Sequence, residues 1–183
     1  PISIKVEDKY VRAVKGGLGE AKTPANYAMS LAAQQEAYAE GFGQVLWLDA
    51  VHRKYIEEVG TMNILFKIKG EIVTPALNGS ILGGITRKTV LELCRSWGVP
   101  AIERQISIDE VYEAHAKGEL EEVFGSGTAA VISPVGELSW KGKRIVINNN
   151  QTGPFAQKLF DYITGVQSGK IEDKFNWMEE IKG

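Results

Sequence analysis

The sequence has very few of the residues that cross-link proteins or ligate metals. Its 183 residues include one cysteine, Cys94, and two histidines, His52 and His115. One cysteine excludes an internal disulfide framework and an all-cysteine zinc site. The two histidines lie far apart and neither sits in a metal-ligand pattern, so we expect no metal centre.

Long apolar runs and an excess of charge of one sign are also missing. No apolar run approaches the length that spans a bilayer, and no signal-peptide pattern opens the chain. The chain carries 21 lysines and arginines against 23 aspartates and glutamates, a formal net charge of −2. This balance argues against a basic nucleic-acid-binding surface and a polybasic membrane anchor. With 44% hydrophobic residues, the composition is that of a globular domain, and we expect a cytoplasmic protein without nucleic-acid or membrane partners.

The apolar periodicity switches repeatedly between the helical and the strand pattern, which indicates mixed secondary structure. Helices are predicted at 26–40, after Thr86 as N-cap, after Ser107 in a capping box with Glu110, and at 153–166. Strands are predicted at 44–48, 64–68, 71–74, 101–105, 129–132 and 144–147. Because the strands fall in hairpin-like groups, the predicted fold class is α+β rather than a doubly wound sheet, in a single domain over 1–183.

A glycine-rich segment places Lys22 just before a predicted helix, in the stretch KGGLGEAKTPANY at 15–27. Glycines let the backbone turn tightly and approach a ligand. A lysine whose pKa is lowered by burial or by a neighbouring cation is a nucleophile that forms Schiff bases. The alternative is a surface turn with a solvated lysine, which is the commoner state of this residue.

Two further segments with glycines suit anion binding. The first, GGIT at 83–86, enters a predicted helix, whose N–H groups and dipole favour an anion, and the Thr86 hydroxyl adds a donor. In the second, FGSGTAA at 124–130, small residues expose successive amides as in an anion-binding nest. Neither matches the Walker A or the GxGxxG pattern. The alternative for 83–86 is simple helix capping, and that for 124–130 is a tight connection between strands. Taken together, the two segments make phosphate binding about as favoured as these purely structural roles.

Acidic residues occur at two places of interest. Glu57 and Glu58 come just before an apolar strand. If Glu58 points inward, it needs a cationic or proton-donating partner, because an unpaired buried carboxylate is costly. The commoner alternative is a solvated turn. The run of Glu119, Glu121 and Glu122 is predicted to be a solvated face.

Taken together and in this order, the motifs resemble the fold-type IV pyridoxal-phosphate enzymes, and most closely the branched-chain amino acid aminotransferases. The resemblance is carried by KGGLGEAKTPANY (15–27), QVLWLD (44–49), EVGTMN (58–63), ILGGITRKTVLEL (81–93) and FGSGTAAVISPV (124–135), and it extends to GPFAQKL (153–159). Ordered agreement over five spaced motifs is far more specific than any one of them. It implies the large C-terminal domain of that fold, a mixed sheet or pseudo-barrel with flanking helices.

The resemblance implies a reaction and three residues at its centre. Lys22 would form the internal aldimine with pyridoxal 5'-phosphate and shuttle the proton. Tyr27 would hydrogen-bond the phenolic oxygen of the cofactor. Glu58 would pair with the pyridinium nitrogen, the acidic partner that such a ring needs. The reaction would be a reversible ping-pong transfer of an amino group from leucine, isoleucine or valine to 2-oxoglutarate.

The same resemblance implies which residues bind the phosphate of the cofactor and which lie near the substrate. Ile85, through its N–H, Thr86 and Thr128 would hold the phosphate. Thr61, Thr128 and Ala129 would lie near the substrate carboxylate. These assignments agree with the anion sites inferred above from glycine spacing and helix position.

One departure from the family concerns the position of the lysine. Full-length members have two domains and carry the catalytic lysine near the middle of the chain, whereas here it is residue 22. The expectation is that the N-terminal small domain is absent, and with it an arginine that grips the phosphate and part of the substrate pocket. This chain alone is then expected to bind the cofactor weakly or not at all and to be inactive, while the full-length form acts as a homodimer. Some relatives carry a Cys-x-x-Cys pair where this chain has Ala130 and Ser133, so no thiol switch is expected.

Two alternatives stay open. A D-amino acid aminotransferase or an aminodeoxychorismate lyase has the same fold and would reuse Lys22 and Glu58, although the GEAK-to-NY stretch and EVGTMN favour the branched-chain enzymes. The second alternative is a folded, non-catalytic fragment without bound cofactor.

Overall fold

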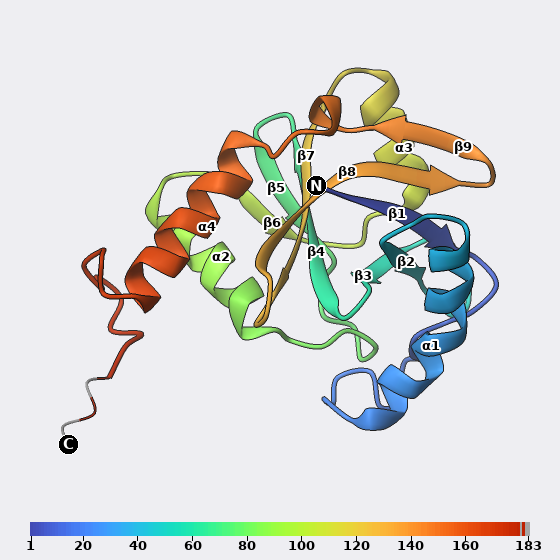
Figure 1. The fold of residues 1–183 in the computed structure, drawn as a ribbon, viewed down its shortest axis with the longest axis horizontal. Coiled ribbons are helices and arrows are strands. Elements are labelled where there is room, and N and C mark those ends of the chain that lie inside the picture. Colours follow the sequence, from blue (N-terminus) through green and yellow to red (C-terminus); the bar gives the residue numbers. More distant parts are fainter. Residues whose placement is uncertain (180, 182–183) are drawn as a thin grey trace.

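Helices and strands follow one another along residues 1–179 and 181, the part of the chain that this computed structural model describes (Figure 1). The α-helices are α1 (Pro24–Ala39), α2 (Ile85–Ser96), α3 (Ile108–Ala116) and α4 (Pro154–Gln167). The strands are β1 (Ile2–Glu7), β2 (Gln44–Leu48), β3 (Ile56–Val59), β4 (Met62–Ile68), β5 (Glu71–Thr74), β6 (Ala101–Glu103), β7 (Leu120–Gly127), β8 (Val131–Trp140) and β9 (Lys143–Val146). Within this described part, the helices are too short or too polar to cross a membrane.

Six of the strands close into a barrel. Hydrogen bonds join β3, β2, β1, β8, β7 and β4 in that order, and β3 also pairs with β4, which connects the two ends of the row. Strands β5 and β6 extend the sheet from β4, and β9 pairs with the C-terminal half of β8. The β1–β2, β1–β8 and β5–β6 pairs are parallel, whereas the other pairs are antiparallel. This mixed, closed sheet with flanking helices confirms the predicted α+β class.

The sheet separates two hydrophobic clusters, because successive side chains of a strand point to opposite faces. On β4, Ile64 and Phe66 are buried in the first cluster together with residues of α3, whereas Leu65 between them lies in the second. Leu93 of α2 and Leu159 of α4 complete the second cluster, and Figure 1 shows these two helices lying on the same side of the sheet. Both faces of β4 are therefore covered, which holds the strand firmly at the centre of the fold.

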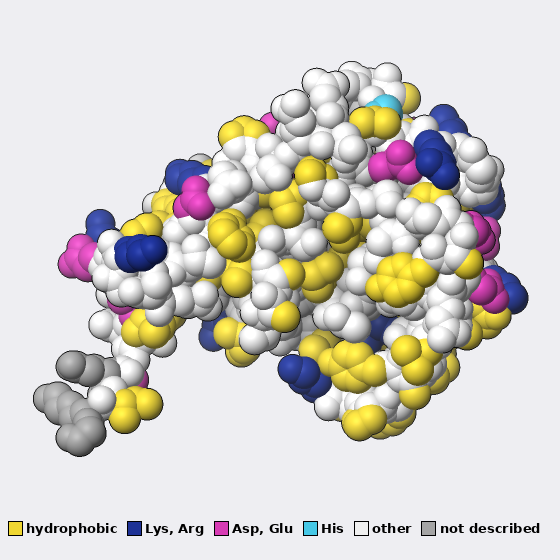
Figure 2. Space-filling view, in the orientation of Figure 1, with side chains coloured by type: hydrophobic (Ala, Val, Ile, Leu, Met, Phe, Trp, Pro, Cys, Tyr) yellow, Lys and Arg dark blue, Asp and Glu magenta, His cyan; other side chains and the backbone are white. Residues whose placement is uncertain are grey.

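Helix α1 packs on the barrel through small or polar side chains. The residues that it buries are Asn26, Ser30, Ala33 and Ala37. The two alanines join Trp47 of β2 in a third hydrophobic cluster. The larger apolar side chains Met29 and Leu31 are 56% and 60% exposed, and Figure 2 shows hydrophobic atoms gathered over this helix and the loop before it.

Most predicted elements are confirmed to within a few residues, but one helix start is wrong. Ser107 caps α3 as predicted, accepting the N–H of Glu110 at 3.1 Å. The helix predicted to follow Thr86 instead begins at Ile85, with Gly84 as an N-cap that has no side chain to offer. Strands β1, β3 and β7 were not predicted. In β3 all four residues are buried, so the strand shows no alternation of apolar and polar residues.

The prediction of a solvated acidic face is wrong for one of its three residues. Glu122 is 4% exposed, and its two carboxylate oxygens accept the N–H groups of Phe155 and Ala156, each at 2.9 Å. These are N–H groups of the first turn of α4, where a carboxylate is favoured by the helix dipole. Glu119 and Glu121 lie nearer the surface and form ion pairs with lysines.

Candidate functional site

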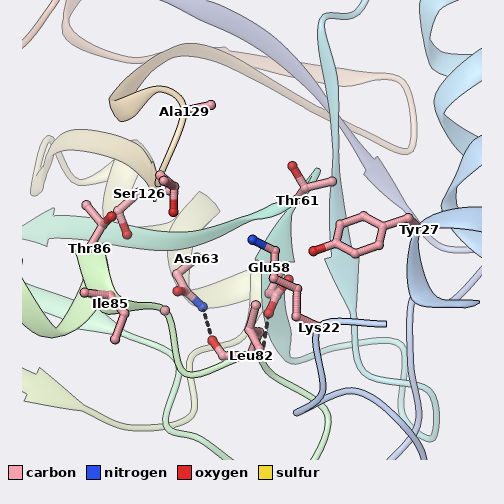
Figure 3. Close-up of a pocket in the computed structure, with 13 residues that line it drawn as sticks. Lys22, Tyr27, Glu58, Thr61, Asn63, Leu82, Ile85, Thr86, Ser126 and Ala129 are labelled. Atoms are coloured by element: carbon pink, nitrogen blue, oxygen red, sulfur yellow. Dashed lines mark hydrogen bonds between the residues drawn. The ribbon is translucent and has the colours of Figure 1, made fainter. Parts of the chain in front are cut away.

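A pocket of about 310 Å³ lies where the loop before α1, the β3–β4 hairpin, the N-terminus of α2 and the end of β7 meet (Figure 3). All eight residues predicted to bind cofactor or substrate line it: Lys22, Tyr27, Glu58, Thr61, Ile85, Thr86, Thr128 and Ala129. The rest of the lining consists of Asn63, Leu82, Gly84, Ser126 and Gly127. The structure thus brings the predicted residues together from distant parts of the chain, and the role of each stays a prediction.

Lys22 lies at the end of an irregular loop, one residue before Thr23, the N-cap of α1. The side-chain amide of Asn26 donates to the carbonyls of Leu18 and Ala21, at 2.7 and 2.9 Å, which ties this loop to the first turn of the helix. The Lys22 side chain is exposed to the pocket. In Figure 3 the Lys22 amine and the Tyr27 hydroxyl both point into the pocket, so a ligand there meets an amine and a hydrogen-bonding hydroxyl together.

Glu58 points inward from β3 and is 3% exposed. Its Oε1 accepts the N–H of Leu82 at 2.7 Å, and its Oε2 lies 3.2 Å from Nε of Arg12. Burial raises the pKa of Glu58 to about 7, against the lowering effects of Arg12 and of the Leu82 N–H group. The inward orientation with a cationic partner is thus confirmed, and the alternative of a solvated turn is wrong.

The N-terminus of α2 forms another part of the lining. Its N-cap, Gly84, has no side chain that could accept the first N–H groups of the helix. A Cβ atom on Gly84 would lie 2.2 Å from Oδ1 of Asn63, so a larger residue here would have to displace the Asn63 amide. The Asn63 amide donates to the carbonyl of Leu82 at 2.7 Å, which fixes the entry into the helix. Uncapped N–H groups at Ile85 and Thr86 make this end suitable for an anion.

Ser126 supplies a second polar group beside this helix end. It is 2% exposed, and its Oγ has no hydrogen-bond partner among the residues that the structure describes. It is paired across the β4–β7 ladder with Asn63, and in Figure 3 it lies next to Thr86. The predicted nest at 124–130 is therefore a strand as far as Gly127, and only Thr128, Ala129 and Ala130 lie in the turn that follows it. An unpartnered buried hydroxyl is unfavourable unless a ligand supplies its partner.

A second pocket of about 300 Å³ adjoins the first. The two share the wall formed by Thr61, Gly127, Thr128 and Ala129. Met62 lines the second pocket but not the first. The residues predicted to lie near the substrate carboxylate therefore form the wall between two neighbouring pockets.

The lining fits pyridoxal 5'-phosphate by its chemistry. The exposed amine of Lys22 suits the carbonyl group of such a molecule, and the buried carboxylate of Glu58 suits its ring nitrogen. The uncapped N-terminus of α2 and the unpartnered hydroxyl of Ser126 suit its phosphate. Within residues 1–179 and 181 there is no group of three acidic, histidine or cysteine side chains that could hold a metal ion.

Comparison with known proteins gives matches over nearly the whole chain. The family model for amino-transferase class IV matches residues 3–138. The chain is 61% identical over 181 residues to branched-chain-amino-acid aminotransferase 2 of Bacillus subtilis (strain 168), and the match covers 99% of this chain and 50% of that protein. It is 45% identical over 181 residues to a probable branched-chain-amino-acid aminotransferase of Streptomyces coelicolor, with the same coverages of 99% and 50%. The chain thus spans about half the length of the curated relatives it matches.

Solved structures give the same result for the fold. The branched-chain amino acid aminotransferase of Escherichia coli superposes with a TM-score of 0.84 at 29% identity, covering 98% of this chain and 55% of that one. The T.th. branched-chain amino acid aminotransferase superposes with a TM-score of 0.81 at 26% identity, covering 96% and 55%. That protein was solved in complex with N-(5'-phosphopyridoxyl)-L-glutamate and also with pyridoxamine 5'-phosphate.

Proposed function

Because this chain belongs to the class IV aminotransferases, we propose that its pocket holds pyridoxal 5'-phosphate and serves the transfer of an amino group from leucine, isoleucine or valine to 2-oxoglutarate. The observation that carries the proposal is the placement of an exposed amine, Lys22, and a buried carboxylate, Glu58, on one pocket. The names of the relatives support the branched-chain substrates. The pyridoxyl compounds bound to the T.th. enzyme support the cofactor.

Three residues act on the reacting end of the cofactor in this proposal. When bound, the cofactor supplies an electrophilic carbonyl and a ring that accepts electrons. Lys22 would supply the amine that holds the cofactor at its carbonyl carbon, and its Nζ, when free, would hold and return the proton that moves during the transfer. The Tyr27 hydroxyl donates a hydrogen bond to the phenolic oxygen. Glu58, in its ionised form, favours a protonated ring nitrogen, because an opposite charge in contact stabilises the charged form.

Other residues hold the phosphate and the substrate. The N–H group of Ile85 and the hydroxyls of Thr86 and Thr128 donate to the phosphate, and the buried hydroxyl of Ser126 adds a donor that the sequence motifs did not identify. Thr61, Thr128 and Ala129 lie near the carboxylate of the substrate, at the wall between the two pockets.

The proposed activity is that of a protein of the relatives' full length, since the chain spans about half of each relative. We propose that residues 1–183 form its cofactor-binding large domain and that the full-length protein is a cytoplasmic homodimer in branched-chain amino acid biosynthesis. The chain alone is expected to bind the cofactor weakly and to be inactive. The reason is that the family resemblance implies an arginine that grips the phosphate, and this arginine is expected to lie outside residues 1–183. A charge-assisted contact of that kind is among the stronger polar interactions.

The cofactor site is tested by covalent trapping. The chain is incubated with a large excess of pyridoxal 5'-phosphate and reduced with borohydride, and the modified lysine is identified by mass spectrometry. We expect the label at Lys22, its loss in Lys22→Ala, and full labelling in Lys15→Ala, which removes an exposed lysine of the same loop. Equal labelling of surface lysines, unaffected by Lys22→Ala, contradicts the site.

The substrate class is tested on a full-length protein that contains this chain. We expect L-leucine to react with 2-oxoglutarate, and D-alanine and aminodeoxychorismate to remain unchanged. Reaction of D-alanine or aminodeoxychorismate in place of L-leucine would show that the pocket serves one of the other activities of this fold.

A further inference from the structure

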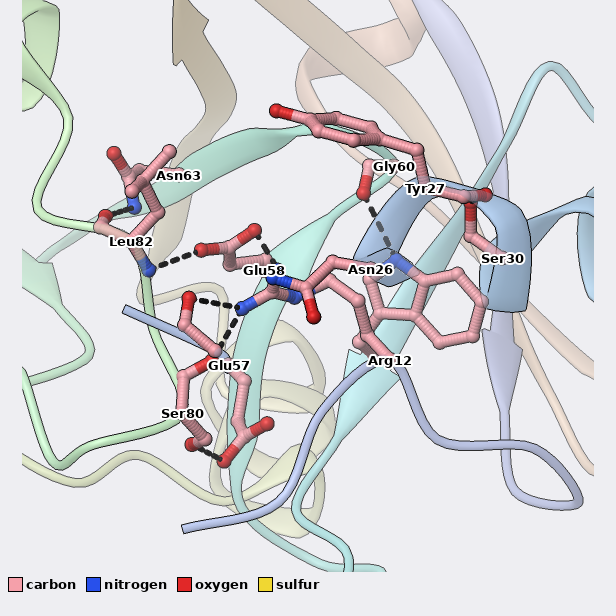
Figure 4. Close-up of polar contacts among 12 residues, drawn as sticks. Arg12, Asn26, Tyr27, Ser30, Glu57, Glu58, Gly60, Asn63, Ser80 and Leu82 are labelled. Carbon is pink, nitrogen blue, oxygen red and sulfur yellow. Dashed lines mark hydrogen bonds and ion pairs between the residues drawn. The ribbon is translucent and has the colours of Figure 1, made fainter. Parts of the chain in front are cut away.

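A buried arginine outside the pocket joins the loop of Lys22 to Glu58 (Figure 4). Arg12 is 6% exposed. Its Nε lies 3.2 Å from Oε2 of Glu58, and its Nη2 donates to the backbone carbonyls of Gly19, at 3.2 Å, and of Ser80. One guanidinium group therefore contacts the carboxylate, the loop that carries the lysine, and the segment between β5 and α2.

The charge of Glu58 depends on this contact. The groups that face its carboxylate are Arg12 from the loop, the neighbouring Glu57 on β3 and the N–H of Leu82, and Lys22 lines the same pocket. Burial and Glu57 raise the pKa of Glu58, whereas Arg12 is the largest of the influences that lower it. Without Arg12, the pKa of this buried carboxylate would lie further above its usual value, because burial disfavours the charged form.

The position of Lys22 depends on the same arginine. The loop between β1 and α1 has no regular structure, so side chains must hold its backbone. The Asn26 amide binds the carbonyls of Leu18 and Ala21 from the side of α1. Arg12 binds a carbonyl between these two from the side of the barrel. Lys22 itself is exposed, so these backbone contacts determine where its side chain begins.

We propose that Arg12 is a positioning residue that couples the two halves of the site, stabilising the charged form of the Glu58 carboxylate and fixing the loop so that Lys22 faces the same pocket. The inference rests on the proposed function, because it concerns the two groups assigned there to the ends of the cofactor. Arg12 does not line the 310 Å³ pocket itself. It acts through Lys22 and Glu58, which do. A guanidinium suits this task, because its fixed fork of N–H donors serves several acceptors at once.

The test uses the cofactor-free chain. The titration of Glu58 is followed by carboxyl ¹³C NMR, with the resonance assigned by its loss in Glu58→Gln. Hydrogen exchange of the amides at 18–22 reports on the loop. In Arg12→Met we expect the Glu58 midpoint to rise by about one pH unit or more, a tenfold change in proton affinity, and the loop amides to exchange at least tenfold faster. The control Arg104→Met removes an arginine that is ion-paired with Glu110 outside the pocket, and it should change neither quantity.

The conservative variant Arg12→Lys separates charge from geometry. It keeps the charge, so the Glu58 midpoint should stay near that of the wild type, but a single ammonium group cannot replace the fork of donors, so loop exchange should still accelerate. An unchanged midpoint or unchanged loop exchange in Arg12→Met overturns the proposal. If Arg12→Met does not fold, wild-type loop exchange in Arg12→Lys overturns it. Because no cofactor is present, failure of this coupling is distinct from failure of Lys22 labelling, which bears on the proposed function.

Discussion

Gly19 packs so closely against the backbone of Ser80 that there is no room for a side chain at position 19. A Cβ atom on Gly19 would lie 2.4 Å from both Cα and the carbonyl oxygen of Ser80. Such contacts are with backbone, which cannot rotate away as the end of a flexible side chain can. The loop of Lys22 is therefore seated directly on the segment that leads into α2, and the two walls of the pocket are in contact.

Replacement of this glycine should loosen the loop. We expect Gly19→Ala to lower the free energy of unfolding by about 1–3 kcal/mol, the usual range for overpacking, and to lower labelling of Lys22 by pyridoxal 5'-phosphate. Urea unfolding measures the first and mass spectrometry the second. The matched control is Gly83→Ala, whose new Cβ would meet only Cδ1 of Leu77, at 3.4 Å. Equal stability of the two variants would contradict the close approach.

The unpartnered hydroxyl of Ser126 leads to opposite predictions for stability and for binding. Because a buried donor without a partner is unfavourable, Ser126→Ala should leave the chain equally stable or stabilise it by up to about 1 kcal/mol in urea unfolding. In a full-length protein, the same change should weaken pyridoxal 5'-phosphate binding about fivefold or more, since one donor to the phosphate is lost. Pyridoxal, which lacks the phosphate, serves as the control ligand. If its affinity falls equally, Ser126 does not act on the phosphate.

The buried carboxylates of β3 predict an unusual dependence of stability on pH. The pKa of Glu58 is raised from 4.5 to about 7, mainly by burial, and that of Glu57 is raised for the same reason. The folded chain then binds more protons than the unfolded chain between these values, so its stability is highest below pH 4.5 as far as these groups are concerned and is lost as the pH rises through 7.

We expect the free energy of unfolding of the cofactor-free chain to fall by on the order of 2 kcal/mol between pH 5 and pH 7.5. Asp49 and Glu121, whose pKa values are lowered, act below this range. Urea unfolding at several pH values measures the fall, and Glu58→Gln should reduce it by more than half, because glutamine stands in for the neutral acid. A flat profile in the unmodified chain would show that Glu58 titrates normally.

The contact of Glu122 with α4 predicts a large effect from a small change. Glu122→Gln leaves one of the two N–H groups of Phe155 and Ala156 without its acceptor and removes a charge from the helix N-terminus. We expect a loss of about 1–3 kcal/mol in the free energy of unfolding. Glu119→Gln, which removes only a surface ion pair with Lys69, should cost less than about 1 kcal/mol. Similar losses for both variants would contradict the buried role.

The sequence was sufficient to predict the elements and residues that depend on local patterns. The helix at 26–40 follows from its run of helix-forming residues, and the cap of α3 from Ser107 and Glu110. The residues of the pocket came from the order of spaced motifs rather than from any one of them. Lys22 and Thr86, which lie far apart in the chain, are assigned together for that reason, and the structure brings both to the pocket.

What the sequence did not reveal depends on contacts between distant segments. Two adjacent glutamates are ordinarily solvated, and Glu58 is buried because β3 closes the barrel and Arg12 reaches it from the loop between β1 and α1. Glu122 is buried by a helix that begins more than 30 residues later. Ser126 faces the pocket because β7 continues where a turn was predicted. Each of these is a polar residue whose partner is fixed by topology, which periodicity does not report.

The small residues that α1 packs against β2 set the distance between this helix and the barrel. Ala33 and Ala37 set how near the helix axis lies to the barrel, and Asn26, on the same face of the helix, holds the loop that ends in Lys22. The distance at which α1 packs on the barrel therefore helps to set where the loop that ends in Lys22 lies. A bulkier side chain at either alanine would move the helix outward and shift Lys22 relative to Glu58, although neither alanine lines the pocket.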